Sequence, residues 1–188
     1  YIEDDNGRYI YCSGTDYLGM AYNTKLKKAI IEAYDQFGVN YGSTRKHRLF
    51  DDIYNLAERN FAHWVGLEAA LTVSSGTLAG QLVRNTVRAL GYTLIEFPRL
   101  HPALKDIFED QLEQKLEKPG ENFLEKIQRI PSNKIALLCV AVDPLTSSLV
   151  NLDFINQIKN KEILIILDDT HGLGVLGNGG GGYLELYP

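Results

Sequence analysis

The chain has 188 residues, of which 45% are hydrophobic and 23% charged, and its formal charge is −5. This composition is that of an ordinary globular protein and excludes the disordered, collagenous and fibrous classes. Because 24 acidic residues outnumber 19 basic ones, no overall charge draws the chain to nucleic acid or to an anionic membrane, and neither is expected as a partner. Any anionic ligand must be held by a local site.

The expected setting is soluble, reducing and cytoplasmic. The longest strongly apolar run, 135–142, is far shorter than the roughly 18 residues that a transmembrane helix needs. Two cysteines, Cys12 and Cys139, give neither a disulfide framework nor the spacing of a metal knuckle. The chain starts at Tyr1 without a Met or a basic-then-apolar leader and stops at Pro188 after a glycine run, so both ends look like cuts in a longer protein.

Two amphipathic helices are predicted in the first third of the chain. Residues 25–37 carry apolar side chains at three- and four-residue steps, with Thr24 as the expected N-cap and Gly38 as the stop. Residues 51–65 repeat this pattern, and Gly66 closes the second helix.

From residue 69 onward, predicted strands alternate with predicted helices. The strands are expected at 69–73, 93–97, 135–142 and 163–167, and the helices at 77–90, 103–117, 122–129 and 152–159. The last two strands are continuous apolar runs, as expected for strands covered on both faces. This alternation predicts an α/β fold with three αβα layers around a mostly parallel sheet.

In open parallel sheets, ligands bind beyond the carboxyl ends of the strands, so the residues after each apolar run are candidates. Ser74, Ser75, Gly76 and Thr77 precede a helix whose N–H groups and positive dipole end can hold a phosphate. The alternative is an ordinary capped helix start. Neither a G-x-G-x-x-G nor a Walker A pattern is present, which disfavours dinucleotide or ATP binding.

A second candidate, Asp168-Asp169-Thr170-His171, directly follows the strand at 163–167. A carboxylate at the end of a buried strand is costly unless it meets a cation, a metal or hydrogen-bond donors, so a positively charged partner is expected for Asp168. The alternative is that Asp168 or Asp169 caps the following loop.

The histidines carry little information by themselves. His101 lies shortly after a predicted strand, but a lone histidine is usually a surface or packing residue, and the same holds for His47 and His63. Asp168, His171 and His101 lack the close ligand pairs of zinc sites, so no metal site is expected.

Together, several segments resemble motifs of the α-oxoamine synthase family of pyridoxal 5'-phosphate (PLP) enzymes. They are residues 16–21 (DYLGMA), similar to N-Y-L-G-L-A; 42–45 (GSTR), similar to G-G-S-R; 66–70 (GLEAA) with 74–76 (SSG); and 168–177 (DDTHGLGVLG), similar to D-E-A-H-S-x-G-V-L-G. The last motif is specific, His101 has a family-like spacing, and the resemblance covers nearly the whole chain.

The resemblance implies a PLP-dependent transferase of fold type I, like aspartate aminotransferase, with an N-terminal segment at 1–43 and an incomplete PLP-binding large domain at 44–188. Its implied substrates are an amino acid and an acyl-CoA, which would be condensed with release of carbon dioxide and CoA. It also implies a homodimer with active sites at the subunit interface.

The resemblance assigns catalytic roles to Asp168, His171 and His101. Asp168 would pair with the protonated pyridine nitrogen, so that the ring can absorb the electrons of a substrate carbanion. His171 would hydrogen-bond the phenolic oxygen of the ring, and His101 would stack on the ring face.

The phosphate would be held at Ser75, with the backbone N–H groups of Gly76 and Thr77 as donors. The Schiff-base lysine of the family lies beyond the D-x-x-H motif, and no lysine of this chain is at a matching position. The 188-residue chain alone is therefore expected to be inactive.

The chain departs from the family's pattern at several positions. Arg48 and Leu49 stand where the family has serine and glycine, and Tyr54 stands where it has histidine. Phe97 and Leu100 replace polar residues, and Pro144 replaces a cofactor-contacting serine. The departures keep open a non-catalytic relative or subunit. Another fold-type-I enzyme, such as an aminotransferase or a lyase, and a simple nucleotide-binding α/β domain are further alternatives.

Overall fold

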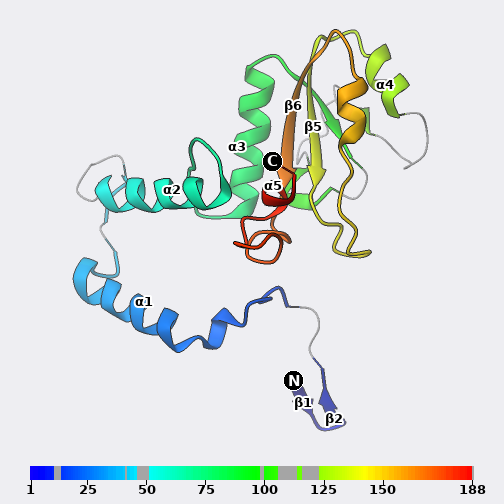
Figure 1. The fold of residues 1–188 in the computed structure, drawn as a ribbon. Coiled ribbons are helices and arrows are strands. Elements are labelled where there is room, and N and C mark those ends of the chain that lie inside the picture. Colours follow the sequence, from blue (N-terminus) through cyan, green and yellow to red (C-terminus); the bar gives the residue numbers. More distant parts are fainter. Residues whose placement is uncertain are drawn as a thin grey trace. The chain divides into compact units, whose positions relative to one another are not determined.

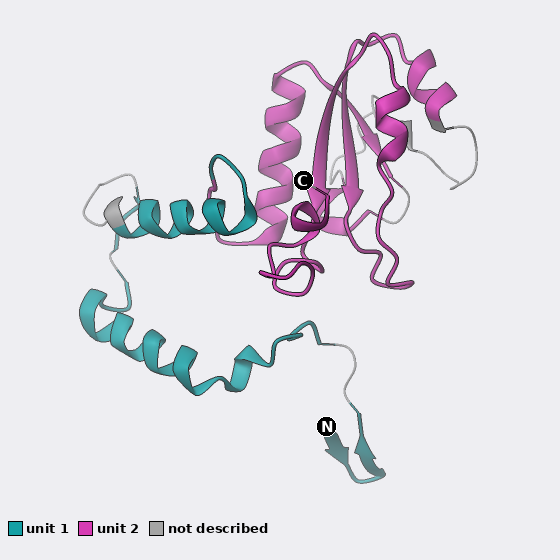
Figure 2. Cartoon of the chain, in the orientation of Figure 1, with its two compact units in different colours: residues 1–69 teal, residues 70–188 magenta. Residues whose placement is uncertain are grey.

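The computed structural model describes residues 1–10, 14–40, 42–45, 51–97, 100–105, 114–115 and 123–187 (Figure 1). The chain divides into two compact units, Tyr1–Ala69 and Ala70–Pro188 (Figure 2). This division rests on backbone contacts, and the motif-based boundary between residues 43 and 44 stays a prediction.

The first unit contains a short hairpin and the two predicted helices. Its elements are β1 (Ile2–Asp4), β2 (Gly7–Tyr9), the 3₁₀ helix η1 (Met20–Tyr22), α1 (Thr24–Phe37) and α2 (Asp51–Val65), with β1 and β2 antiparallel. Both helix predictions are confirmed.

The N-cap of α1 is Asn23, and the prediction of Thr24 is wrong by one residue. The Asn23 Oδ1 accepts hydrogen bonds from the N–H groups of Lys25 and Leu26, at 3.0 Å each. Asparagine caps a helix at least as well as threonine, so the adjacent Thr24 enters the first turn. At the other end Gly38, with φ 75°, closes the helix as predicted.

The second unit is an α/β layer structure. Its elements are α3 (Gly76–Ala89), β3 (Thr93–Glu96), η3 (Pro102–Leu104), β4 (Gln114–Lys115), α4 (Phe123–Arg129), β5 (Lys134–Val140), η4 (Asp153–Gln157), β6 (Glu162–Asp168) and α5 (Tyr183–Leu186). The strand order among the described residues is β4-β3-β5-β6, and every pairing is parallel.

Strand β5 is covered on both faces, as predicted, whereas β6 contains no buried residue, so the same prediction for β6 is wrong. Alternate β5 residues enter two clusters: Ala136 and Leu138 pack with Val87 of α3, whereas Leu137 packs with Ile127 of α4. Figure 1 shows α3 and α4 on opposite sides of the sheet. The predicted α/β fold with three αβα layers and a mostly parallel sheet is therefore confirmed.

Three predicted elements of this unit are wrong. Residues 69–73 form no strand and pair with none of the described strands. Within the predicted helix at 103–117, the structure instead has the end of η3 and the strand β4, while residues 106–113 and 116–117 lie outside the described residues. The predicted helix at 152–159 is the five-residue 3₁₀ helix η4.

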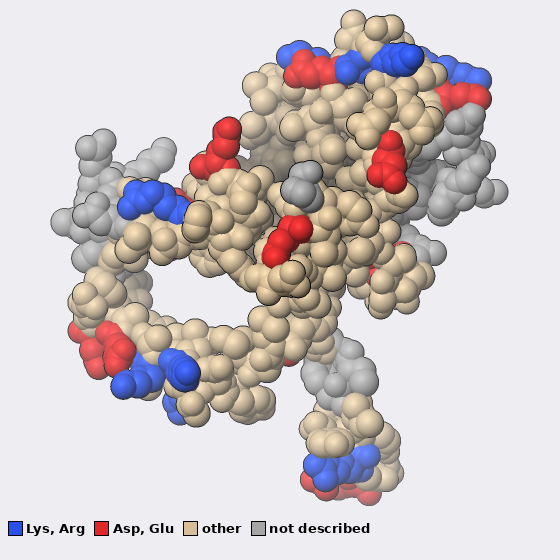
Figure 3. All heavy atoms as spheres, in the orientation of Figure 1, with Lys and Arg blue, Asp and Glu red and all other residues tan. Residues whose placement is uncertain are grey.

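None of the helices formed by the described residues is both long and apolar enough to cross a membrane. Charged side chains of both signs are interspersed on the face shown in Figure 3.

Candidate functional site

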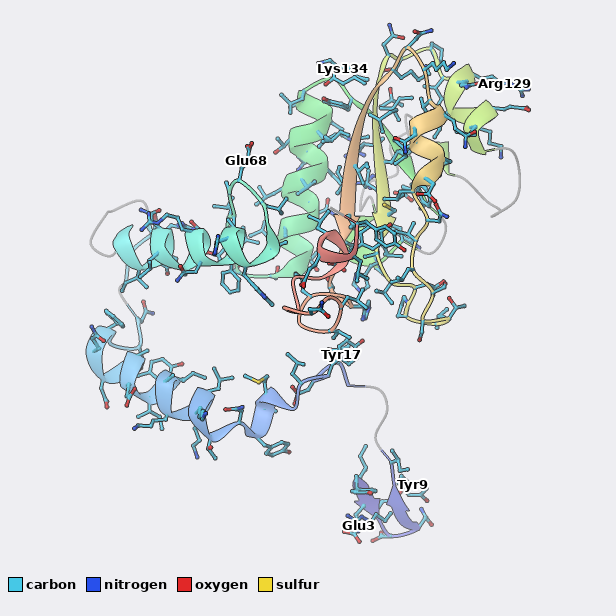
Figure 4. All side chains as sticks on the ribbon, viewed as in Figure 1. Glu3, Tyr9, Tyr17, Glu68, Arg129 and Lys134 are labelled. Atoms are coloured by element: carbon cyan, nitrogen blue, oxygen red, sulfur yellow. The ribbon has the colours of Figure 1, made fainter. Side chains whose placement is uncertain are left out.

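Several candidate residues of the second unit lie at or shortly after the carboxyl ends of strands. Val140 at the end of β5 lies opposite Asp168 at the end of β6, and β3 ends at Glu96. Since α3 runs back to the amino end of β3, its own N-terminus lies toward the carboxyl edge (Figure 1). Lys134, labelled in Figure 4, marks the opposite edge, where β5 begins.

The first turn of α3 combines a cap with exposed N–H groups. The Ser75 Oγ accepts a hydrogen bond from Leu78 N at 3.1 Å, so this is a capped helix start. The N–H groups of Gly76 and Thr77 have no acceptor within the helix, and both residues are exposed. A Cβ built on Gly76 would meet no atom within 4 Å, so an anion has room to approach the backbone. The cap and an anion site are therefore compatible here.

Asp168 caps the loop that follows β6. Its Oδ1 accepts hydrogen bonds from Thr170 N at 3.1 Å and from Thr170 Oγ1 at 2.6 Å. The carboxylate is half-buried, and no ion pair joins it to a lysine or arginine of the described residues. The loop-cap interpretation is thus confirmed, while the expected cation is not supplied by the described part of the chain.

Asp169 faces into the following loop and anchors it. Its Oδ2 accepts a hydrogen bond from Tyr183 N at 2.7 Å, and its Oδ1 is buried without a partner among the described residues. A Cβ on Gly172 or on Gly182 would collide with this carboxylate. Burial raises the pKa of Asp169, and the hydrogen bond from Tyr183 opposes that rise. Adjacent aspartates thus have different roles.

A second carboxylate, that of Glu185, also binds the loop that follows β6. Glu185 in α5 accepts hydrogen bonds from Gly179 N and Gly181 N, at 2.7 Å each. These bonds to the ionised form lower the pKa of Glu185. His171 is half-buried at the start of this loop, which Asp169 and Glu185 hold in place.

His101 is exposed and caps η3. Its Nδ1 accepts a hydrogen bond from Ala103 N at 3.1 Å, and its carbonyl accepts one from Leu104 N at 2.9 Å. A ring nitrogen that accepts a hydrogen bond carries no proton, so the neutral ring has its proton on Nε2. The imidazole is therefore held in one tautomer.

These groups fit PLP. The first turn of α3 offers N–H donors for a phosphate. Asp168 offers a carboxylate that pairs with no cation of the described residues, and His101 offers an aromatic ring. All six candidate residues belong to the second unit. Ser75 caps α3, Gly76 and Thr77 form its first turn, His101 comes after β3, Asp168 ends β6, and His171 lies three residues later. Within the described residues, no cluster of histidine, cysteine or acidic side chains could hold a metal ion.

Sequence reasoning missed a buried ion pair between Arg84 of α3 and Glu96 of β3. Arg84 Nη1 lies 3.1 Å from Glu96 Oε1 and also donates a hydrogen bond to the carbonyl of Leu104. The available signal was position: Arg84 lies on the same helix face as Gly80 and Val87, which are both buried.

In the first unit, the arginine of the 42–45 motif also has a defined environment. Arg45 donates two hydrogen bonds to Glu58 of α2, at 2.8 and 2.9 Å, and its guanidinium lies 4.6 Å from the centre of the Tyr54 ring. Tyr54, which stands where the family has histidine, therefore packs its ring against the guanidinium of Arg45. Arg48 and Leu49 lie outside the described residues.

Comparison with known proteins finds relatives along nearly the whole chain, and two of them illustrate the similarity. The chain is 26% identical over 187 residues to 8-amino-7-oxononanoate synthase of Aliivibrio fischeri, covering 97% of the chain and 49% of the relative. It is 30% identical over 193 residues to the synthase of Petrotoga mobilis, and this match covers 96% of the chain and 48% of the relative. The chain thus spans about half the length of the curated relatives it matches. No family model matches the chain.

Solved structures show the same fold. Serine palmitoyltransferase of Sphingomonas wittichii superposes with a TM-score of 0.77 at 21% identity, over 91% of this chain and 44% of that one. For 8-amino-7-oxononanoate synthase of Francisella tularensis the TM-score is 0.69 at 22% identity, and the match covers 92% of this chain and 48% of that one. A serine palmitoyltransferase from S. paucimobilis, solved with bound PLP, gives 0.75 at 19% identity, over 91% and 44%. The chain is therefore similar in sequence to 8-amino-7-oxononanoate synthases, and over the part that it spans it has the fold of the PLP-dependent fold-type-I enzymes.

Proposed function

We propose that the protein binds PLP and is an acyltransferase that condenses an amino acid with an acyl-CoA, with release of carbon dioxide and CoA. The model for this activity is 8-amino-7-oxononanoate synthase, which would place the protein in biotin biosynthesis. The observation that carries the proposal is the position of Asp168, which ends β6 at the edge toward which the exposed first turn of α3 lies.

When bound, PLP supplies an electron sink for a carbanion at the α-carbon of the substrate. Asp168 would accept a hydrogen bond from the pyridine nitrogen and favour its protonated form, since a nearby carboxylate stabilises a cation. Thr170 fixes Asp168 through two hydrogen bonds, so the carboxylate is oriented before the cofactor binds.

The other residues would bind and orient the cofactor. The N–H groups of Gly76 and Thr77 would donate to the phosphate, strengthened by the dipole of the 14-residue helix α3. His101 would pack its ring against the pyridine ring, and His171 would donate a hydrogen bond to the phenolic oxygen. The lysine that anchors PLP in the family would come from beyond Pro188. A homodimer and a cytoplasmic location are part of the same proposal.

The test uses protein expressed from its complete gene, incubated with PLP, amino acids and acyl-CoA thioesters, with release of CoA measured by a thiol reagent. The proposal predicts CoA release that requires both substrates and is lost in Asp168→Asn. Asp5→Asn, the same change at an exposed turn residue of the first unit, should leave the rate unchanged.

The second candidate is a non-catalytic relative, and the segment after β5 is the observation that favours it. Pro144, in place of the family's contact serine, is exposed in a turn closed by Asp143, whose Oδ1 accepts hydrogen bonds from Leu145 N and Thr146 N. PLP binding without CoA release from any substrate pair would support this alternative.

A further inference from the structure

One face of α3 holds the backbone just after His101. The Gln81 Nε2 donates hydrogen bonds to the carbonyls of Ala103, at 3.4 Å, and of Lys105, at 3.0 Å. One turn further along, the fully buried Arg84 donates to the carbonyl of Leu104. Three consecutive carbonyls are therefore bound by two side chains of one helix.

Close packing and a buried charge hold the two segments together. Gly80 is buried, and a Cβ on it would lie well inside contact distance of the Ala103 carbonyl. Arg84 is itself held by Glu96 of β3, so this interaction is tied to the sheet. The helix thus approaches the His101–Lys105 segment at Gly80 and holds it through Gln81 and Arg84.

The orientation of His101 depends on this segment. Its ring is held by the N–H group of Ala103, which lies beside a carbonyl that Gln81 binds. A shift of this backbone would release the Nδ1 of His101 from its donor. The imidazole, which is exposed, would then sample other rotamers and the other tautomer.

We propose that Gln81 and Arg84 are positioning residues that orient His101 toward the cofactor, an inference that rests on the proposed function for what His101 contacts. The same helix would then do two tasks: its first turn would hold the phosphate, and its next two turns would fix the ring that stacks on the pyridine. The spacing between the phosphate-binding N–H groups and the His101 ring would then be set by the single helix α3.

The test is a double-mutant cycle on PLP affinity, measured by titrating the apo form of the protein from its complete gene. Gln81→Glu keeps the shape of the side chain but replaces the donating amide with a carboxylate that repels two carbonyls. Asn85→Asp makes the same change at an exposed position one turn later and is the matched control. His101→Ala and the double variant Gln81→Glu/His101→Ala complete the cycle.

We expect Gln81→Glu to weaken PLP binding roughly five- to tenfold, the effect of one or two lost hydrogen bonds, and Asn85→Asp to leave it unchanged. The double variant should bind no more weakly than His101→Ala, because Gln81 acts through His101. Effects that add in the double variant, or a Gln81→Glu affinity equal to that of Asn85→Asp, would overturn the proposal.

A second readout separates this inference from the proposed function. Amide hydrogen exchange of residues 101–105 should be faster in Gln81→Glu than in Asn85→Asp, without any cofactor present. If the parent protein binds no PLP but exchange is faster, the proposed function fails while the structural coupling stands. If the parent binds PLP and exchange is unchanged, the positioning role is wrong.

Discussion

Arg84 and Glu96 form an ion pair inside the second unit, with 0% and 6% of their side chains exposed. The pair joins α3 to β3, and Arg84 continues the connection to η3 through the Leu104 carbonyl. Burying two charges is expensive, so such a pair adds little net stability over apolar residues, but removing one partner leaves the other charge uncompensated.

Glu96→Ala should therefore destabilise the protein by about 3–5 kcal/mol, measured by urea denaturation. Glu125→Ala is the control, since Glu125 pairs with Arg129 on the exposed surface of α4 and its loss should cost less than about 1 kcal/mol. Equal costs for the two variants would show that the Arg84–Glu96 pair is not buried in solution.

Gly80→Ala should also destabilise the folded protein, although alanine is a better helix former than glycine. The added methyl would displace the backbone of Ala103, and overpacking of this kind costs roughly 1–3 kcal/mol. Gly76→Ala, with no atom within 4 Å of the added Cβ, should be neutral or slightly stabilising. Thermal denaturation of both variants checks the pair, and a Gly80→Ala protein as stable as Gly76→Ala would contradict the close approach.

The parts of the fold that sequence predicts well are those with strong local patterns. β5 and β6 are continuous apolar runs, and α3 has clear helical spacing. The segment that contains β4 is rich in lysine and glutamate, which wrongly predicts a helix there. The pairing of β4 with Ile95 and Glu96 of β3 is a long-range contact without a local signal.

The same distinction applies to the candidate site. The 168–171 motif located a sheet edge correctly, because the end of an apolar run is visible in the sequence. The different roles of Asp168 and Asp169 were not predictable, since they depend on Tyr183, which is fourteen residues further along the chain. The hydrogen bonds from Gln81 to the η3 segment leave no pattern in the sequence, because they join a side chain to backbone carbonyls that lie far along the chain.

The loop after His171 should loosen in acid. Glu185 has a lowered pKa in the folded protein, so its contribution to stability is present above its ordinary pKa and is lost as pH falls through the lowered one. The melting temperature of Glu185→Gln should be below that of the parent at about pH 6, and the difference should shrink toward about pH 3. A difference independent of pH would mean that the ionised carboxylate does not hold the loop.

Cys139 should resist alkylation in the folded protein. Its side chain is fully buried in β5, and burial raises its pKa to about 12, so almost no thiolate exists at about pH 8. Iodoacetamide followed by peptide mass analysis should label Cys139 after denaturation and leave it unmodified before. Rapid labelling of the native protein at this cysteine would contradict the packed three-layer core.

The central claim is that the carboxyl edge of the sheet binds PLP. The most direct measurement is the intact mass of the protein expressed from its complete gene, after PLP addition and borohydride reduction. One reduced PLP per chain, in a protein much heavier than 21.1 kDa, is the predicted result. A complete protein that gains no adduct would contradict the claim and leave a relative that keeps the fold without the cofactor.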